Sequence, residues 1–316
     1  MTGVKKRNFL TTTRGIFLTA MVCCFLWGSA SPCVKIGYEL FRMDTDHIPT
    51  LLLYAGLRFT LAGVLGVVFG SMVKGKVLFP ARQGWSCVLI MGMVQTVIQY
   101  IFYYIGFANT TGVKGSIICG SNSFFSILIA CFIFRQEKFT SRKALGCALG
   151  FAGVVLINLT GGGLGGGFAW NGEGFIVCST TTYALSSVLM RIFGQKDDPV
   201  TISGYQFILG GIILSGIGFV FGGRLVFYSV SCVLMLIYLG FVSAGAFALW
   251  SILLKYNPVS KVSIFSMMTP IFGVTLSTLL LSENSQVSFV QALSALALVS
   301  LGIWTINRTE KVKSTS

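Results

Sequence analysis

Two basic side chains, Lys35 and Arg58, occur inside long apolar stretches of the chain. At 1.5 Å per helical residue, Arg58 stands roughly 12 Å in from the start of its stretch. A charge that faces lipid costs at least about 2.5–3.5 kcal/mol, so each base either reaches back to the headgroups or faces a wet cavity. No acidic residue lies mid-stretch beside Arg58. The chemistry predicted for these bases is therefore the binding of an anionic group, such as a substrate carboxylate.

Groups for acid–base, nucleophilic or metal chemistry are missing from the middle of these stretches. The one histidine, His47, and all nine acidic residues lie in predicted loops or at the ends of stretches. An intramembrane enzyme needs a Ser–His pair, paired aspartates or a metal cluster at depth. The sequence thus predicts no enzyme activity, no cofactor and no metal site. It favours a facilitator driven by the substrate's own gradient, because proton-coupled transporters usually relay protons through buried Asp, Glu or His.

Neutral polar and aromatic residues indicate a polar path between helices. Gln95 and Gln99 are four positions apart and share one helical face, which Tyr103 continues. Each such residue alone has a plainer explanation in helix-to-helix hydrogen bonding, packing or an interfacial belt. Together they predict a substrate-binding cavity, with these candidate residues: Trp27, Lys35, Arg58, Gln95, Gln99, Tyr100, Tyr103, Asn122, Thr182, Tyr183, Gln206, Trp250, Ser263 and Ser266.

The elements that must hold these residues are ten apolar stretches of about bilayer length. Hydrophobic residues make up 54% of the 316-residue chain and charged residues only 10%, against about 25% in soluble domains. Mean hydropathy is +0.83. A spanning helix needs roughly 20 apolar residues. The predicted spans are Gly15–Gly37, Thr50–Val73, Gly84–Phe107, Gly112–Phe134, Ala144–Leu159, Gly174–Phe193, Val200–Phe221, Val230–Leu254, Val262–Leu281 and Val287–Ile306.

These stretches predict an all-α integral membrane protein. They are continuous rather than alternating, so helices are favoured over a β-barrel. A buried soluble core is excluded, because too few polar residues remain to cover the surface of a chain of this length.

The net charge of +14 follows from membrane topology rather than from nucleic-acid binding. If the spans alternate from a cytoplasmic N-terminus, only Arg42, Lys114 and Arg224 lie on the far side, and 18 of the 23 basic residues lie in cytoplasmic segments. This bias obeys the positive-inside rule. We therefore expect a multi-pass protein of the cell membrane with both termini in the cytoplasm. Its partners are the lipid bilayer and a small-molecule substrate, with no nucleic acid, and we expect a monomer or a homodimer.

The chain divides into two halves around a glycine-rich segment at 161–167. We expect a first five-helix repeat at 1–160, a flexible connector at 161–172, a second repeat at 173–307 and a cytoplasmic tail at 308–316. Four matches share an offset of 147, with Lys114, Ser116, Ile117 and Phe125 aligned to Lys261, Ser263, Ile264 and Phe272. Because five spans is an odd number, the second repeat must insert upside down, as in transporters that alternate access about a midplane site.

Glu137 and Glu283 each follow the fourth span of their half. Both are expected to bind nearby bases, such as Lys138, or helix ends rather than to carry protons. The segment from Trp27 to Lys35 aligns with the segment from Tyr183 to Arg191, so that an aromatic falls on an aromatic and a base on a base.

The order and spacing of several motifs resemble the EamA-like branch of the drug/metabolite transporter superfamily. The resembling residues are Trp27-Gly28-Ser29 with Lys35, Arg58-Phe59, Glu137 before Gly146 and Gly153-Val154-Val155-Leu156, and Pro270 with Glu283 before Gly302. The resemblance implies ten helices in two inverted five-helix repeats, a central cavity and transport of small metabolites, often amino acids. In one departure, Ser123 or Phe124 stands where the family often has a proline, as at Pro270.

Small residues and one proline are assigned to the scaffold. Gly146, Gly150, Gly153 and Gly302 let helix backbones approach closely, and Pro270 shapes its helix.

The sequence predicts an alternating-access transporter of small organic metabolites, which exports them or carries them in both directions. Amino acids or related carboxylated solutes fit best. A cation exporter would want a buried acid, and a phosphate carrier a denser basic cluster. An exporter of lipophilic drugs or amines, a carrier of nucleotide-linked sugars and a channel-like pore remain as alternatives.

Overall fold

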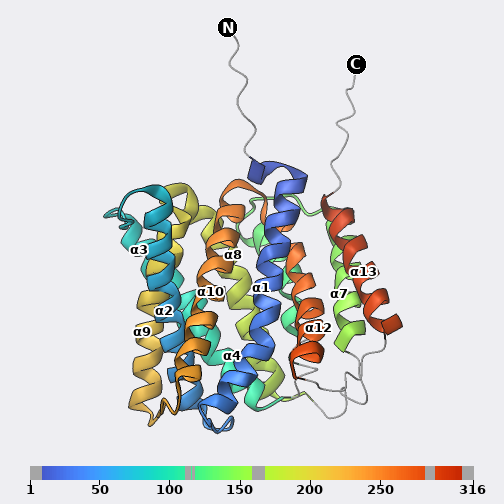
Figure 1. The fold of residues 1–316 in the computed structure, drawn as a ribbon. Coiled ribbons are helices and arrows are strands. Elements are labelled where there is room, and N and C mark those ends of the chain that lie inside the picture. The colour runs from blue at the N-terminus through green and yellow to red at the C-terminus, as the bar shows by residue number, and fades with distance from the viewer. Residues whose placement is uncertain (1–8, 111–114, 116–117, 159–167, 282–288, 308–316) are drawn as a thin grey trace, which may run out of the picture.

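The computed structural model describes residues 9–110, 115, 118–158, 168–281 and 289–307. Throughout these residues the regular structure is helical, and the long helices run side by side as one bundle (Figure 1). The α-helices are α1 (Thr13–Leu40), α2 (Ile48–Lys74), α3 (Gly84–Met91), α4 (Gln99–Ala108), α6 (Asn122–Leu128), α7 (Ser141–Asn158), α8 (Phe175–Lys196), α9 (Pro199–Val220), α10 (Val230–Tyr256), α11 (Val259–Ser263), α12 (Thr269–Leu281) and α13 (Phe289–Asn307).

Six helical runs in the described part are long and apolar enough to cross a membrane: Thr13–Leu40, Ile48–Lys74, Gly84–Ala108, Trp170–Lys196, Pro199–Val220 and Val230–Tyr256. Shorter apolar helices occupy Ile118–Ile133 and Leu293–Asn307. The all-helical class predicted from the sequence is confirmed for the described residues. The glycine-rich segment at 161–167, which is predicted to be part of a flexible connector, lies outside the described residues.

Several helix ends carry the sequence signals that fix them. Thr12 caps α1 by accepting a hydrogen bond from Gly15 N at 3.1 Å. Asp198 caps α9 by accepting from Thr201 N at 3.0 Å, and Pro199 follows at the first helical position. Helix α2 ends at Gly75, whose φ of 62° is the left-handed conformation that glycine adopts without strain.

Some predicted spans are less regular than expected. The stretch Val262–Leu281 is not one α-helix, because the 3₁₀ segment η5 (Ile264–Met268) separates α11 from α12. Pro270 lacks a backbone N–H and its ring crowds the carbonyl four residues earlier, which accounts for the tighter turn before it. The third span contains the π-helical segment η2 (Gly92–Ile98), and the fourth ends in another, η3 (Ile129–Ile133).

Another π-helical segment, η4 (Trp170–Gly174), precedes α8. Helical structure therefore begins at Trp170, within the last residues of the connector predicted at 161–172.

Two pairs of helices pack through small residues. Helix α2 packs along α9, where a Cβ added to Gly211 would come within 2.5 Å of Thr60 N. On the opposite side of the bundle α7 packs on α13 (Figure 1), where a Cβ added to Gly302 would come within 2.6 Å of Gly146 O. Both pairs therefore depend on bare backbone at the contact.

Helix α1 begins and α13 ends at the same end of the bundle (Figure 1). The loop between α10 and α11 lies at this end as well, because Asn257 Nδ2 donates to Leu10 O at 2.9 Å. We call it the terminal end, and the opposite one the far end.

At the terminal end the carboxylate of Glu137 joins segments from both halves of the chain. It accepts hydrogen bonds from Lys143 Nζ at 2.8 Å, Arg191 Nη1 at 3.4 Å and Ser260 N at 3.2 Å, and also from the Ser260 hydroxyl. Burial alone would raise the pKa of Glu137, but the hydrogen bonds from Lys143 and Ser260 outweigh it and hold the pKa below its usual value. The bases that pair with Glu137 are Lys143 and Arg191 rather than Lys138, and Glu283 lies outside the described residues.

Candidate functional site

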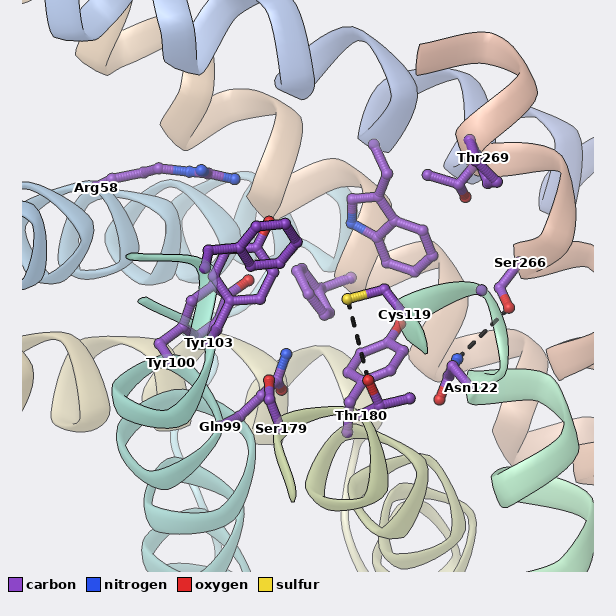
Figure 2. A pocket seen from close by; sticks show the side chains of 16 residues that line it. Arg58, Gln99, Tyr100, Tyr103, Cys119, Asn122, Ser179, Thr180, Ser266 and Thr269 are labelled. Atoms are coloured by element: carbon purple, nitrogen blue, oxygen red, sulfur yellow. Dashed lines mark hydrogen bonds between the residues drawn. The ribbon is translucent and has the colours of Figure 1, made fainter. Parts of the chain in front are cut away.

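A cavity of about 290 Å³ lies inside the bundle, walled by both halves of the chain. The first half contributes residues from α1, α2, α4, α6 and the segment before α6, and the second half from α8, α10, η5 and α12. In Figure 2 Arg58 lies on one side and Asn122, Ser266 and Thr269 lie on the other. The lining residues are Trp27, Arg58, Gln99, Tyr100, Tyr103, Phe107, Cys119, Gly120, Asn122, Ser179, Thr180, Tyr183, Phe247, Ser266, Thr269 and Pro270.

Arg58 brings a fixed positive charge to this cavity. Its side chain is buried, with the residue 7% exposed. The guanidinium donates to the Ser243 hydroxyl from Nε at 3.3 Å and from Nη2 at 3.0 Å. A guanidinium carries five N–H donors, and no described residue accepts from Nη1. The charge thus has only neutral partners in the described part of the protein, the Ser243 hydroxyl and the ring of Phe59, 5.1 Å from the guanidinium carbon, and it retains donors for an anion.

Aromatic rings cover much of the cavity wall. The ring of Trp27 lies 5.1 Å from that of Phe247 and 6.4 Å from that of Tyr183, both edge to face. The ring of Tyr103 lies 5.9 Å from that of Tyr100 and 4.5 Å from that of Phe107. Such spacings are typical of favourable ring contacts, and they make a continuous apolar surface beside Arg58.

Polar atoms complete the lining. Asn122 Nδ2 donates to Ser266 Oγ at 3.4 Å, and Thr180 Oγ1 lies 4.0 Å from Cys119 Sγ, as the dashed lines in Figure 2 mark. Trp27 Nε1 and Gln99 Oε1 are buried and have no hydrogen-bond partner among the described residues. A buried polar group without a partner is costly, and this donor and this acceptor are the atoms of these two lining residues that lack a partner in the described part of the protein.

Eight of the fourteen candidates from the sequence line the cavity: Trp27, Arg58, Gln99, Tyr100, Tyr103, Asn122, Tyr183 and Ser266. The other six lie elsewhere. Lys35 is exposed near the far end of α1, and the Thr182 hydroxyl bonds back to Cys178 O at 2.6 Å.

Three of those six belong to buried contacts behind the wall. Gln206 Nε2 donates to Gln95 Oε1 at 3.2 Å, and Gln206 Oε1 accepts from Thr96 Oγ1 at 2.9 Å. The ring of Trp250 packs 5.0 Å from that of Trp27, on the side away from the lining. The sixth, Ser263, is buried, and its carbonyl accepts from Ser123 Oγ at 2.5 Å.

Seven lining residues were not candidates, and Pro270 was assigned only to the scaffold. Phe107, Gly120 and Phe247 carry no polar signal that would single them out. For three of the seven, Cys119, Thr269 and Phe247, the repeat offset was a signal, because Cys119 and Thr269 stand 147 positions from the candidates Ser266 and Asn122, and Phe247 stands 148 from Gln99. Ser179 and Thr180 belong to the polar run that ends at Tyr183, and they face inward while Thr182 does not.

The chemistry of the cavity is that of binding rather than bond breaking. No Asp, Glu or His is among the described residues that line it. In the described part of the chain no three His, Cys, Asp or Glu side chains gather as metal ligands would. What remains is one cation, a ring-covered wall and neutral donors and acceptors, which together suit an organic anion.

Two relatives that span nearly the whole chain are named as transporters. An uncharacterized transporter of Synechocystis sp. is 26% identical, with 94% of this chain and 91% of its own covered. An uncharacterized transporter of Bacillus subtilis is 24% identical, with 93% of each chain covered. A WAT1-related chloroplastic protein of Arabidopsis thaliana is 26% identical, with 89% of this chain and 68% of its own covered.

The fold is also similar to that of a solved crystal structure of a protein, with a TM-score of 0.74 and 20% sequence identity, over 94% of this chain and 97% of that one. The EamA-like transporter family itself matches residues 14–159 and 170–308. The resemblance predicted from the sequence is thereby confirmed, and the chain is a multi-pass membrane transporter rather than an enzyme. By this match across both halves, the protein belongs to the EamA-like transporter family.

Proposed function

We propose that this protein carries small carboxylated solutes, amino acids or related metabolites, across the cell membrane by alternating access. The observation that carries the proposal is the buried guanidinium of Arg58, which lines the cavity and has only the neutral Ser243 hydroxyl as an acceptor among the described residues. A fixed cation at membrane depth is expensive without a counter-ion. A substrate carboxylate supplies that counter-ion, since guanidinium and carboxylate form strong paired hydrogen bonds.

The transport mechanism in this proposal rests on ten helices in two inverted five-helix repeats. Two buried hydrogen bonds support the repeat. Arg58 donates to Ser243, and Gln206 donates to Gln95. Arg58 and Gln206 are 148 positions apart, and so are Gln95 and Ser243. Each bond therefore joins the second span of one half to the third span of the other, as a pseudo-two-fold axis requires.

The packing of whole helices has the same reciprocity. Helix α1 packs on α10 and α12, while its counterpart α8 packs on α4 and α6. Helices α2 and α9 are counterparts that pack on each other, and so are α7 and α13. In this scheme the cavity lies at the junction of the repeats, where rocking of one half against the other opens it to alternate sides.

The proposed topology has both chain ends in the cytoplasm. The start of α1 and the end of α13 share one end of the bundle (Figure 1), and the positive-inside bias of the sequence favours the cytoplasm for that side. We propose repeats at 1–160 and 173–307, joined by the glycine-rich connector, acting as a monomer or homodimer. Because no Asp, Glu or His lines the cavity in the described part of the chain, we propose that the substrate's own gradient drives export or bidirectional flux.

Counterflow in proteoliposomes tests this function. Liposomes loaded with each unlabelled solute of a carboxylate and amine library are mixed with its trace label, with and without a pH gradient. We expect saturable counterflow for carboxylates without a pH gradient. Arg58→Gln should lower it about 10–100-fold, the effect of losing about 1.5–3 kcal/mol of charged hydrogen bonding.

Arg82→Gln is the matched control, since Arg82 is exposed in the loop before α3. It should transport like the unaltered protein. Counterflow restricted to lipophilic amines, or flux that rises linearly with concentration and never saturates, would contradict the proposal and favour a drug exporter or a pore respectively.

A further inference from the structure

The cavity holds one charge and many rings. Among its described lining residues Arg58 is the only ionised side chain. Its other prominent feature is a set of six aromatic side chains: Trp27, Tyr100, Tyr103, Phe107, Tyr183 and Phe247. These rings belong to α1, α4, α8 and α10, so both halves of the chain supply them.

The charge balance distinguishes between classes of carboxylated solute. A monocarboxylate neutralises Arg58, so that the occupied cavity carries no net charge. A zwitterionic amino acid adds an ammonium group as well and leaves a net positive charge in the cavity. Burying a charge without an ionic partner is strongly unfavourable, and none of the lining residues that the structure describes is a carboxylate that could receive that ammonium.

The shape and surface of the cavity favour a ring on the solute. Its volume of about 290 Å³ is at the small end of small-molecule sites, which run from about 300 to 1,000 Å³. The rings of Trp27 and Phe247, 5.1 Å apart, already meet edge to face. A further ring added to such a surface gains the offset and edge contacts that aromatic groups prefer.

The unpartnered neutral atoms fit this class too. Trp27 Nε1 can donate to the second carboxylate oxygen or to a polar substituent of the solute ring. Gln99 Oε1 can accept a hydrogen bond from a ring hydroxyl or ring N–H. Both atoms are buried without a partner among the described residues, and neither requires a charged group on the solute.

We propose that the substrate class is a ring-bearing monocarboxylate without an ammonium group, its carboxylate on Arg58 and its ring among the six aromatic side chains. This inference rests on the proposed function, because it assigns the same site and narrows its solutes. The inference predicts that the acid without an ammonium group binds more tightly than the amino acid with the same carbon skeleton.

Equilibrium binding with three matched probes tests the inference. The purified full-length protein in lipid nanodiscs is titrated calorimetrically with 3-phenylpropionate, L-phenylalanine and hexanoate. Phenylalanine adds only the ammonium group, and hexanoate keeps the carboxylate but lacks the ring. We expect 3-phenylpropionate to bind at least about tenfold more tightly than either. Equal or tighter binding of phenylalanine overturns the charge argument, and equal or tighter binding of hexanoate overturns the ring argument.

Variants separate the failure of this inference from failure of the proposed function. Arg58→Gln should weaken 3-phenylpropionate binding at least about tenfold, and Arg82→Gln should leave it unchanged, with both variants first shown to be monodisperse and helical. If phenylalanine binds best and its binding requires Arg58, this inference fails and the proposed function stands. If carboxylate binding is the same in Arg58→Gln as in the unaltered protein, both fail.

Discussion

The rings of Trp27 and Tyr183 meet edge to face in the cavity wall, 6.4 Å apart at an interplanar angle of 83°. These two residues correspond in the two halves of the sequence, since each stands eight positions before a base, Lys35 or Arg191. Residues that correspond under a two-fold axis can touch only where that axis passes. The contact therefore supports a pseudo-two-fold axis through the cavity, and with it the proposal that the two halves share one binding site.

Ser243 orients Arg58, and its removal should weaken substrate binding. Ser243→Ala deletes the one described acceptor of the guanidinium, and a hydrogen bond to a charged group is worth about 1.5–3 kcal/mol. We expect Ser243→Ala to raise the half-saturation concentration in counterflow about tenfold. Adding Arg58→Lys to the Ser243→Ala variant should not restore the original value. Ser251→Ala is the control on the same helix, because Ser251 bonds to Ser203 at 2.7 Å away from the cavity. Equal effects of Ser243→Ala and Ser251→Ala would refute a positioning role.

The contact of α2 with α9 should not tolerate one extra methyl group at Gly211. A Cβ there would come within 2.5 Å of Thr60 N and 2.7 Å of Gly56 O, which are backbone atoms that cannot turn aside. Overpacking of this kind costs about 1–3 kcal/mol. We expect Gly211→Ala to lower the thermal midpoint in detergent, measured by circular dichroism. Gly216→Ala, on the same helix with nothing within 4 Å of the added atom, should match the unaltered protein, and a comparable loss there would contradict the packing argument.

Glu137 should make stability at the terminal end dependent on pH. Its pKa in the folded protein lies below the usual value, so the carboxylate contributes stability above the unfolded pKa of about 4.3. That contribution falls as pH drops below this value toward the folded pKa. We expect Glu137→Gln to lower the thermal midpoint at pH 7 and to flatten its decline below about pH 4.5.

Glu39→Gln serves as the comparison for Glu137, because Glu39 is exposed at the end of α1. It should leave both the midpoint at pH 7 and the acid decline unchanged. The account of the Glu137 cluster fails if Glu137→Gln has the same midpoint as the unaltered protein between pH 7 and pH 4.

Transport of a monocarboxylate without a coupling ion should respond to membrane potential. One elementary charge moving across 100 mV changes the free energy by about 2.3 kcal/mol. An inside-positive potential of about 60 mV, set by a potassium gradient with valinomycin, should therefore give roughly tenfold accumulation of 3-phenylpropionate in proteoliposomes. If the accumulation of 3-phenylpropionate did not change with the membrane potential, the transported species would carry no net charge.

The sequence predicted the helical class and the stretches that carry the site, because polar residues in lipid-facing segments are costly enough to stand out. It identified Arg58, Gln99 and Tyr183 for that reason. It did not separate inward from outward faces within a polar run. Ser179, Thr180 and Tyr183 line the cavity, whereas the Thr182 hydroxyl bonds to Cys178 O on its own helix.

Depth along a helix was the second quantity that the sequence did not supply. Gln95 and Gln99 share a face, yet only Gln99 reaches the cavity, because Gln95 lies one turn nearer the terminal end and pairs with Gln206. Apolar lining residues such as Phe107 and Phe247 give no polar signal in a chain that is 54% hydrophobic. The 3₁₀ segment η5 before Pro270 was not predicted either, because the apolar pattern of Val262–Leu281 is that of one continuous span.

The most direct test of the account is a structure of the protein bound to the solute that gives the strongest saturable counterflow. The account predicts that solute between the two halves, with its carboxylate within hydrogen-bonding distance of the Arg58 guanidinium and the rings of Trp27 and Tyr183 beside it. A solute bound outside this cavity, or bound inside it with its carboxylate turned away from Arg58, would contradict the central claim.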